Sequence, residues 1–339
     1  MKISRRMVLV TMAALGLTGV AAAQSLNSAG ASFPDPIYEL WFQKFKAAKS
    51  IQVNYQPQGS GAGISQLQAG TVDFGASDAP MTDEEIAKCK VKPLHFPTVL
   101  GAVVVTYNLP SVKQDLKMSA DVVAKIFMLQ IKKWNDPQIA KLNPGVKLPG
   151  DEIVVCHRAD QSGTTFIFTD FLAKASPEWE KVVGKPSKNP KWPSGTMGQP
   201  LNQGVAGFVK QTENSVGYVE LGYVLENHMQ SALVQNASGE FVKASLDTVT
   251  AAAANSAKAI PDDFRVSIAN PPGKDSYPIA SFTWMLIPSK IPDPAKRKAI
   301  AEFLNWMLTT GQADAGGKGY APLPKAVVTR EIKQISQIQ

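Results

Sequence analysis

Short apolar segments alternate along this chain with longer segments whose apolar residues recur every three or four positions. Four short segments have the length and composition of buried strands: residues 53–55, 99–107, 153–155 and 282–287. Helical spacing of apolar residues marks residues 37–46 and 295–309. Because strand and helix patterns alternate in sequence, we predict an α/β fold.

Proline, glycine and asparagine separate these segments. Three such stretches are predicted to be surface loops: residues 143–145, 185–193 and 271–273. The four alanines at residues 251–254 favour a helix over a linker. The chain has no visible internal repeat, so a repeat architecture is not expected.

The first 23 residues have the pattern of an export signal. Lys2, Arg5 and Arg6 precede an apolar run, and we expect cleavage after Ala23. The run covers residues 7–20, about 14 residues, whereas a membrane-spanning helix needs about 20. We therefore expect an exported, periplasmic protein without a permanent anchor. The paired arginines leave both the general and the twin-arginine export routes open.

Charge and length narrow the classes of function. Loss of residues 1–23 removes Lys2, Arg5 and Arg6 and lowers the formal net charge from +7 to +4. The remaining lysines and arginines are scattered among acidic residues, so nucleic-acid binding is not expected. The remaining length exceeds what one hydrophobic core usually serves, and two domains are predicted.

The two cysteines, Cys89 and Cys156, do not form a motif. Their separation and the lack of a C-x-x-C pair argue against a zinc cluster, and we expect no metal or cofactor. Export permits one disulfide. One disulfide and two free thiols both remain open.

Three segments share a design in which small residues and a hydroxyl stand where a helix is predicted to begin. They are Ala29-Gly30-Ala31-Ser32-Phe33-Pro34, Gly59-Ser60-Gly61-Ala62-Gly63 and Asp160-Gln161-Ser162-Gly163-Thr164. The first N–H groups of a helix lack helical partners, and the helix dipole adds about half a positive charge, so these turns suit an anion. Neutral hydroxyl donors are available from Ser32, Ser60, Ser162 and Thr164. Simple helix capping, worth about 1 kcal/mol, is the alternative at each turn.

Two charged positions fit the same chemistry. Arg158 follows a predicted strand, and ligands of open α/β sheets bind at the carboxyl ends of strands. Its guanidinium can bind two oxygens of a phosphate, and Asp160 could hold it in place. A surface ion pair between Arg158 and Asp160 is the alternative.

Asp78 follows the segment at residues 72–77 and would be an unexpected acid beside an anion. An ionised carboxylate only accepts hydrogen bonds, so it can pair with a phosphate that still carries a proton and repels sulfate, which carries none. A ligand without a proton would leave this buried acceptor unsatisfied, which costs free energy and so disfavours that ligand. A turn or cap role for Asp78 is the alternative.

At these residues the chain closely resembles the phosphate-binding component of the bacterial high-affinity phosphate ABC transporter. The resemblance covers almost the whole mature length, and its motifs occur in order. They include residues 29–34, Gly59-Ser60-Gly61, Val72-Asp73-Phe74-Gly75-Ala76-Ser77-Asp78, Arg158-Ala159-Asp160, Ser162-Gly163-Thr164 and Gly217-Tyr218-Val219-Glu220. A single glycine motif would mean little, but this ordered series is highly specific.

The resemblance implies a type II periplasmic binding protein fold, with two α/β lobes around a ligand cleft. Lobe I would comprise residues 24–98 and 279–339, and lobe II residues 99–278. The implied function is binding of inorganic phosphate and its delivery to the inner-membrane permease subunits of the transporter. We expect a monomer in solution that is not an enzyme.

The resemblance also implies a set of contacts, carried over position by position. The residues expected to contact phosphate are Ser32, Phe33 through its N–H, Ser60, Asp78, Arg158, Ser162, Gly163 and Thr164. Ala31 and Asp160 would support them, with Asp160 steadying Arg158.

Two other functions remain as alternatives. An exported phosphatase or serine hydrolase could use Ser60 or Ser162 with His157 as base, although no G-x-S-x-G motif or histidine cluster is present. A binding protein for sulfate, molybdate or a phosphonate is the other alternative, and Asp78 argues against fully deprotonated anions.

Overall fold

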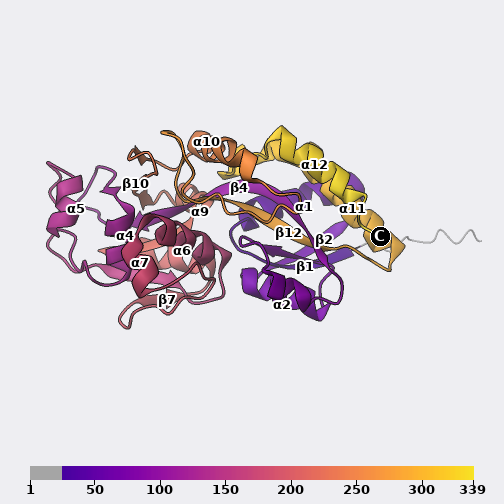
Figure 1. The fold of residues 1–339 in the computed structure, drawn as a ribbon, viewed down its shortest axis with the longest axis horizontal. Helices are drawn as coiled ribbons and strands as arrows, with labels where there is room; N and C mark the ends of the chain where they lie inside the picture. Colours follow the sequence, from indigo (N-terminus) through magenta and orange to yellow (C-terminus); the bar gives the residue numbers. More distant parts are fainter. Residues whose placement is uncertain (1–24) are drawn as a thin grey trace, which may run out of the picture.

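The computed structural model describes residues 25–339. The predicted signal and its cleavage site after Ala23 lie outside the described residues. A single mixed sheet runs through the molecule in the order β2-β1-β3-β12-β4-β8-β6-β7, with β9 paired to β4. Helices lie on both sides of this sheet (Figure 1), so the α/β prediction is confirmed.

The bounds of the elements are as follows. The strands are β1 (Ser25–Gly30), β2 (Gln52–Pro57), β3 (Phe74–Ser77), β4 (Pro93–Tyr107), β5 (Lys117–Met118), β6 (Val154–Arg158), β7 (Met197–Gln199), β8 (Ser215–Glu220), β9 (Gln230–Ser231), β10 (Leu233–Gln235), β11 (Phe241–Val242) and β12 (Ala280–Pro288). The helices are α1 (Asp35–Lys49), α2 (Ser60–Ala69), α3 (Asp83–Ala87), α4 (Ala120–Phe127), α5 (Pro137–Leu142), α6 (Gly163–Ala175), α7 (Pro177–Val182), α8 (Leu201–Gln211), α9 (Leu221–Asn227), α10 (Leu246–Ser256), α11 (Pro294–Thr309) and α12 (Lys325–Ile335). Short 3-10 turns follow at η1 (Ala257–Ala259), η2 (Gly311–Asp314) and η3 (Gly316–Lys318).

The first half of the sheet comprises β2, β1, β3 and β12. β1 pairs in parallel with β2 and β3, and β12 pairs antiparallel with β3. In Figure 1, α11 and α12 lie above these strands and α2 lies below them. The chain therefore builds this half from its two ends.

Aromatic packing fixes the two ends of the chain to each other. Phe42 and Phe45 of α1 contact Phe303 of α11 at centroid distances of 5.3 and 5.1 Å. Both α1 residues and Phe303 are buried. Full burial of each such side chain stabilises the fold by about 1.5–3 kcal/mol, so these contacts hold α1 and α11 together.

β4 belongs to both halves of the sheet. Its residues 93–102 pair with β12, and its residues 103–107 pair with β8. The register with β12 shifts between Thr283 and Trp284, where Trp284 lies opposite Pro97. Proline cannot donate to a strand ladder, so the ladder is interrupted here. The partner change in β4 lies near the predicted boundary at residue 98, which itself stays a prediction.

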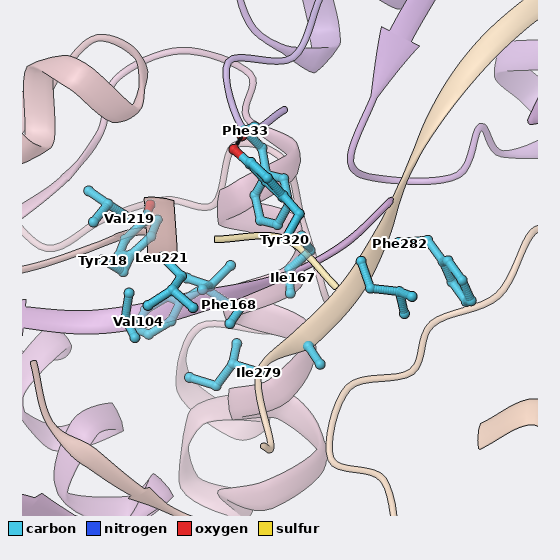
Figure 2. Close-up of a cluster of buried hydrophobic side chains, with 14 of the residues drawn as sticks. Phe33, Val104, Ile167, Phe168, Tyr218, Val219, Leu221, Ile279, Phe282 and Tyr320 are labelled. Atoms are coloured by element: carbon cyan, nitrogen blue, oxygen red, sulfur yellow. Dashed lines mark hydrogen bonds between the residues drawn. The ribbon is translucent and has the colours of Figure 1, made fainter. Parts of the chain in front are cut away.

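The second half comprises the end of β4 with β8, β6 and β7. β6 pairs in parallel with β8 and β7. Helices α4, α6, α7 and α9 lie around these strands in Figure 1, and α8 packs on β8 and β6. Phe168 of α6 stacks on Tyr218 of β8 at 4.3 Å between ring centroids, and Figure 2 shows both in the buried cluster. A small sheet of β11, β10 and β5 lies beside this half.

The predicted segments agree with the structure in type and differ in extent. Residues 53–55, 99–107, 153–155 and 282–287 fall wholly or partly in β2, β4, β6 and β12, and residues 37–46 and 295–309 fall in α1 and α11. Residues 251–254 lie within α10. The loop at residues 143–145 is only partly a surface loop, because the Asn143 side chain is buried and donates to Lys117 O and Ile139 O.

Cys89 and Cys156 are free thiols in this structure. Burial raises the pKa of the Cys156 thiol to about 12, so it stays protonated near neutral pH. The structure therefore contains two free thiols and not the disulfide that export would permit. Within residues 25–339 no helix combines the length and apolar character needed to cross a membrane.

Glu331 of α12 carries a prediction about stability. Its side chain is fully buried, and neither carboxyl oxygen has a partner among the described residues. Burial raises its pKa well above the ordinary value. The folded protein therefore keeps this proton at a pH where the unfolded chain releases it, and stability falls as pH rises above about 4.3.

Glu331→Gln removes this titration. We expect the variant to gain stability over the wild type by about 1.4 kcal/mol per pH unit above about 4.3, measured by urea unfolding at pH 5, 6 and 7. Exposed Glu226→Gln is the control for loss of a carboxyl. A constant difference between Glu331→Gln and wild type across this range would contradict the assignment.

Candidate anion-binding site

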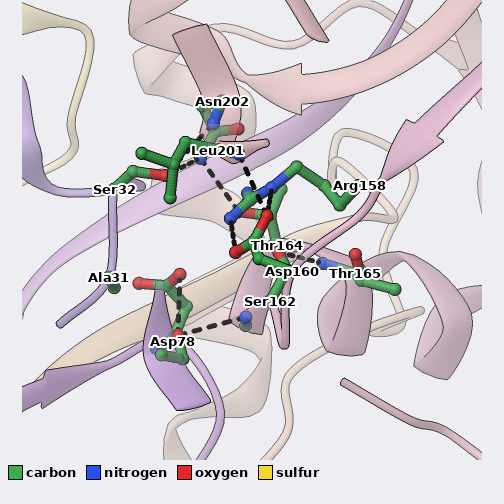
Figure 3. Close-up of polar contacts among 12 residues, drawn as sticks. Ala31, Ser32, Asp78, Arg158, Asp160, Ser162, Thr164, Thr165, Leu201 and Asn202 are labelled. Atoms are coloured by element: carbon green, nitrogen blue, oxygen red, sulfur yellow. Dashed lines mark hydrogen bonds and ion pairs between the residues drawn. The ribbon is translucent and has the colours of Figure 1, made fainter. Parts of the chain in front are cut away.

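The three predicted turns meet between the two halves of the sheet. The first turn precedes α1, the second opens α2, and the third opens α6. Figure 3 shows Ser32 of the first turn and Thr164 of the third near Asn202, and Ser60 of the second turn bonds to Gly163 of the third. The six residues predicted to contact phosphate through polar side chains are each at most 2% exposed: Ser32, Ser60, Asp78, Arg158, Ser162 and Thr164.

Ser60 is the central contact between the halves. Its Oγ accepts hydrogen bonds from the N–H of Asp78 and the N–H of Gly163, each at 3.1 Å. Its hydroxyl faces Asp78 Oδ2 at 3.4 Å. Asp78 follows β3 in the first half, and Gly163 begins α6 in the second. One hydroxyl thus joins two of the predicted turns and the predicted acid.

Glycine is required where α6 approaches α2. A Cβ at Gly163 would lie 2.4 Å from Ser60 Oγ and 2.6 Å from Asp78 Cβ. A Cβ at Gly61 would lie 2.4 Å from Gln161 Cβ. The Gly61 N–H donates to Gln161 O at 2.9 Å. The backbones of the two turns therefore meet directly, with no room for a side chain.

All three guanidinium nitrogens of Arg158 donate hydrogen bonds, two to Asp160 and one to Thr164. Arg158 is the last residue of β6, so the prediction that it ends a strand is confirmed. Its Nε and Nη2 donate to the Asp160 carboxylate at 2.7 and 2.5 Å, and its Nη1 donates to Thr164 Oγ1 at 3.2 Å. Since the Arg158 side chain is only 1% exposed, the surface ion-pair alternative does not describe this arrangement.

Asp160 remains ionised despite its position. Burial alone would raise its pKa, but the hydrogen bonds and charge of Arg158 outweigh burial and lower the pKa below the ordinary value. Asp160 Oδ1 also accepts the N–H of Leu201 at 3.0 Å. The carboxylate therefore fixes the guanidinium in one orientation.

Asp78 has a different environment. Its Oδ1 accepts from Thr283 Oγ1 of β12 at 2.8 Å. Burial raises the pKa of Asp78 to about 7, partly opposed by the Thr283 hydrogen bond, the charge of Arg158 and the Ser60 hydrogen bond. This carboxyl can therefore accept or donate a hydrogen bond, depending on pH.

Helix capping accounts for one of the hydroxyls. Ser162 is the N-cap of α6 and accepts from the Thr165 N–H at 3.0 Å. No side-chain cap is found at the start of α1 or α2. Helix capping therefore explains Ser162. It does not explain Ser32 or Ser60, whose hydroxyls have other partners.

Phe33 and Ala31 are placed by their backbones. Phe33 O accepts from Tyr320 Oη at 2.6 Å, and Ala31 O accepts from Tyr55 Oη at 2.5 Å. The N–H of Phe33 has no protein acceptor within residues 25–339. This N–H is therefore available to an anion.

The enzyme alternative finds no support in the geometry. His157 Nδ1 pairs with Arg158 O at 2.9 Å, and its ring stacks on Trp192 with 4.7 Å between centroids. Burial lowers the pKa of His157. It contacts neither Ser60 nor Ser162, which a general base for either hydroxyl would need to do. Residues 25–339 contain no cluster of metal-ligating side chains.

Sequence reasoning missed Thr283 and Asn202. Thr283 reaches Asp78 only because β12 lies beside β3, some 200 residues away in sequence. Asn202, in the first turn of α8, donates to Ser32 Oγ and Thr164 Oγ1. Asn202 follows Pro200 and Leu201 and carries no motif, so nothing in the local sequence marks it.

The comparisons place the chain in a family. The model of the PBP superfamily domain matches residues 18–310. The phosphate-binding protein PstS of Pasteurella multocida is 42% identical over 309 residues, which are 91% of this chain and 89% of that protein. PstS of Xylella fastidiosa (strain Temecula1) is 40% identical over 304 residues, 89% of this chain and 82% of that protein.

A solved structure agrees in fold. The phosphate-binding protein of Stenotrophomonas maltophilia superposes with a TM-score of 0.71 at 20% identity, covering 92% of this chain and 94% of that one. The fold is therefore of the type II periplasmic binding protein class, as predicted. The chain belongs to the family of phosphate-binding proteins of ABC transporters within the PBP superfamily. The relatives are named as binding proteins and not as enzymes, in agreement with the prediction.

Gly163→Ala tests the close approach of the halves. The added Cβ would overlap Ser60 Oγ, so we expect a loss of about 1–3 kcal/mol of stability and a larger radius of gyration by small-angle X-ray scattering. Gly207→Ala in α8 is the matched control, because a Cβ there meets nothing within 4 Å. An unchanged radius and melting temperature for Gly163→Ala would show that the halves do not depend on this contact.

Proposed function

We propose that this protein binds inorganic phosphate between the two halves of its sheet, in the periplasm, and delivers it to the inner-membrane permease subunits of an ABC transporter. Two kinds of observation support the proposal. The relatives at about 40% identity are named phosphate-binding proteins. The decisive observation is that Asp78, a buried acceptor, stands among neutral donors and one fixed guanidinium.

The donors proposed to hold phosphate are largely neutral. They are the N–H groups of Phe33, Gly163 and Thr164, the hydroxyls of Ser32, Ser60, Ser162 and Thr164, and the Arg158 guanidinium. Ala31 and Asp160 support them from behind. Each hydrogen bond to a charged group contributes about 1.5–3 kcal/mol, so several such donors can offset the desolvation of a doubly charged anion.

Asp78 is proposed to choose between anions. When ionised, Asp78 accepts a hydrogen bond from the protonated oxygen of phosphate, and it repels sulfate, which carries no proton. Arg158 and Asp160 form a balanced pair, so Arg158 supplies direction and little net positive charge. Attraction then comes from the starts of α1, α2 and α6, whose dipoles carry partial positive charge.

Closure of two lobes over the ligand is proposed as the motion of binding. Lobe I comprises residues 24–98 and 279–339, and lobe II residues 99–278, joined through β4 and β12. Ser60 with Gly163, and Glu85 with Lys188, form contacts between the lobes that opening would break. The closed form would present one composite surface to the permease, and the protein would act as a monomer after its export signal is removed.

Calorimetric titration of ligand-free protein with phosphate, arsenate and sulfate tests the proposal. We expect tight binding of phosphate by the wild type, and at least about 100-fold weaker binding by Arg158→Ala, which leaves Asp160 buried without its partner. Arg330→Ala, far along the chain in α12, is the control and should bind as the wild type does.

Near-native affinity of Arg158→Ala would remove Arg158 from the site. Absence of phosphate binding by the wild type would overturn the proposed function. Turnover of a generic phosphate ester would favour the enzyme alternative instead.

Asp78→Asn tests selectivity. The amide can donate to a sulfate oxygen, so we expect the variant to bind sulfate more tightly than the wild type does at pH 8. In the wild type, sulfate binding should strengthen as pH falls from 8 to 6, because Asp78 gains a proton near pH 7. Asp78→Asn should lose that dependence on pH.

Competition between sulfate and phosphate at both pH values measures the effect. Asp170→Asn, a buried acid of α6 that pairs with Lys174, is the matched control. Unchanged discrimination in Asp78→Asn would contradict the role given to the carboxylate.

A further inference from the structure

Besides Ser60, two hydroxyls of the site accept hydrogen bonds with both of their lone pairs. Ser32 Oγ accepts from the N–H of Asn202 at 3.2 Å and from its Nδ2 at 3.0 Å. Thr164 Oγ1 accepts from Asn202 Nδ2 at 3.1 Å and from Arg158 Nη1 at 3.2 Å. A hydroxyl has two acceptor lone pairs and one hydrogen. In each group only the hydrogen is left, so each can act only as a donor.

Asn202 is oriented so that it can only donate to these hydroxyls. Its side chain is fully buried, and its Oδ1 accepts the N–H of Glu220 at 3.0 Å. A backbone N–H must face the oxygen of the amide, so Nδ2 must face Ser32 and Thr164. Both hydrogens of Nδ2 are then used. Figure 3 shows Asn202 above the two hydroxyls.

The backbone before Asn202 is held in an uncommon conformation. Leu201 has a φ of 60°, which is an outlier for a bulky residue. Its N–H donates to Asp160 Oδ1 at 3.0 Å. The carboxylate that fixes Arg158 therefore also fixes the start of α8, and both donors to Thr164 depend on Asp160.

We propose that Asn202 is a positioning residue that turns the hydroxyl hydrogens of Ser32 and Thr164 towards the bound oxyanion. The inference rests on the proposed function and adds a determinant of selectivity to it. At these two points the ligand must present an acceptor oxygen. A ligand proton cannot be received at either of these hydroxyls, which leaves the buried Asp78 carboxylate as the charged acceptor for it.

The direction of the Ser32 hydroxyl hydrogen depends on contact between the two halves of the molecule. Ser32 precedes α1 in the first half, whereas both of its donors come from Asn202 in the second half. Tyr223 of α9 also donates to Ser32 O, at 2.7 Å. When the lobes separate, Ser32 Oγ loses both donors and its hydrogen is free to turn. Closure therefore creates the donor as well as enclosing the ligand.

A double-mutant cycle separates this role from simple support of the fold. Asn202→Ala should weaken phosphate binding by roughly 10- to 100-fold in calorimetry, since two donors to a charged ligand lose their orientation. In a Ser32→Ala/Thr164→Val background the same change should cost less than about twofold, because no hydroxyl is left to orient. Equal losses in both backgrounds would overturn the proposal.

Controls keep the outcome clear. Asn236→Ala removes another buried asparagine, one that bonds only backbone groups around residues 236–240 and 273–276, and should lower stability without changing phosphate affinity. If Asn202→Ala does not fold, Asn202→Ser, which keeps one hydrogen to donate, should show an intermediate loss. Wild-type affinity in Asn202→Ser or Asn202→Ala would overturn the inference alone. Failure of the wild type to bind phosphate would overturn the proposed function.

Discussion

The site depends on one hydroxyl that receives N–H groups from both halves of the molecule. Ser60 Oγ joins the backbone of Asp78 to the start of α6. Because a Cβ at Gly163 would overlap Ser60 Oγ, the contact needs a serine on one side and a glycine on the other. Asp78, Gly61 and Gln161 take their places around this contact. The arrangement of the remaining donors follows from it.

The electrostatics of the site rest on dipoles more than on net charge. Arg158 is paired with Asp160, and Asp78 adds a second carboxyl whose pKa is raised to about 7 by burial. An anion drawn into such a place must be stabilised by oriented N–H and O–H groups. Orientation therefore matters more than the number of donors. For this reason Asn202 and Asp160 are important to the proposed site, although neither is proposed to contact the ligand.

The fold class could be predicted from the sequence, and so could the turns that meet at the candidate site, because both depend on local signals. The turns at Ser32, Ser60 and Ser162 combine glycine, a hydroxyl and a following apolar period, and all of these are local signals. Thr283 and Asn202 could not be found in this way, because their roles come from strands and helices that meet only in the folded chain. The capping role of Ser162 was an open alternative, since a cap and an anion donor use the same residue type. The proposed lobe boundaries follow from the resemblance, and no local signal marks them.

The interruption in the ladder between β4 and β12 has a mechanical consequence. The β4–β12 ladder lacks a donor at Pro97, opposite Trp284 and next to Thr283. Thr283 in turn donates a hydrogen bond to Asp78. In the proposed closure, bending of the two strands at this point would move Thr283 relative to Asp78, so that one hydrogen bond would couple the angle between the lobes to the proton affinity of the Asp78 carboxyl.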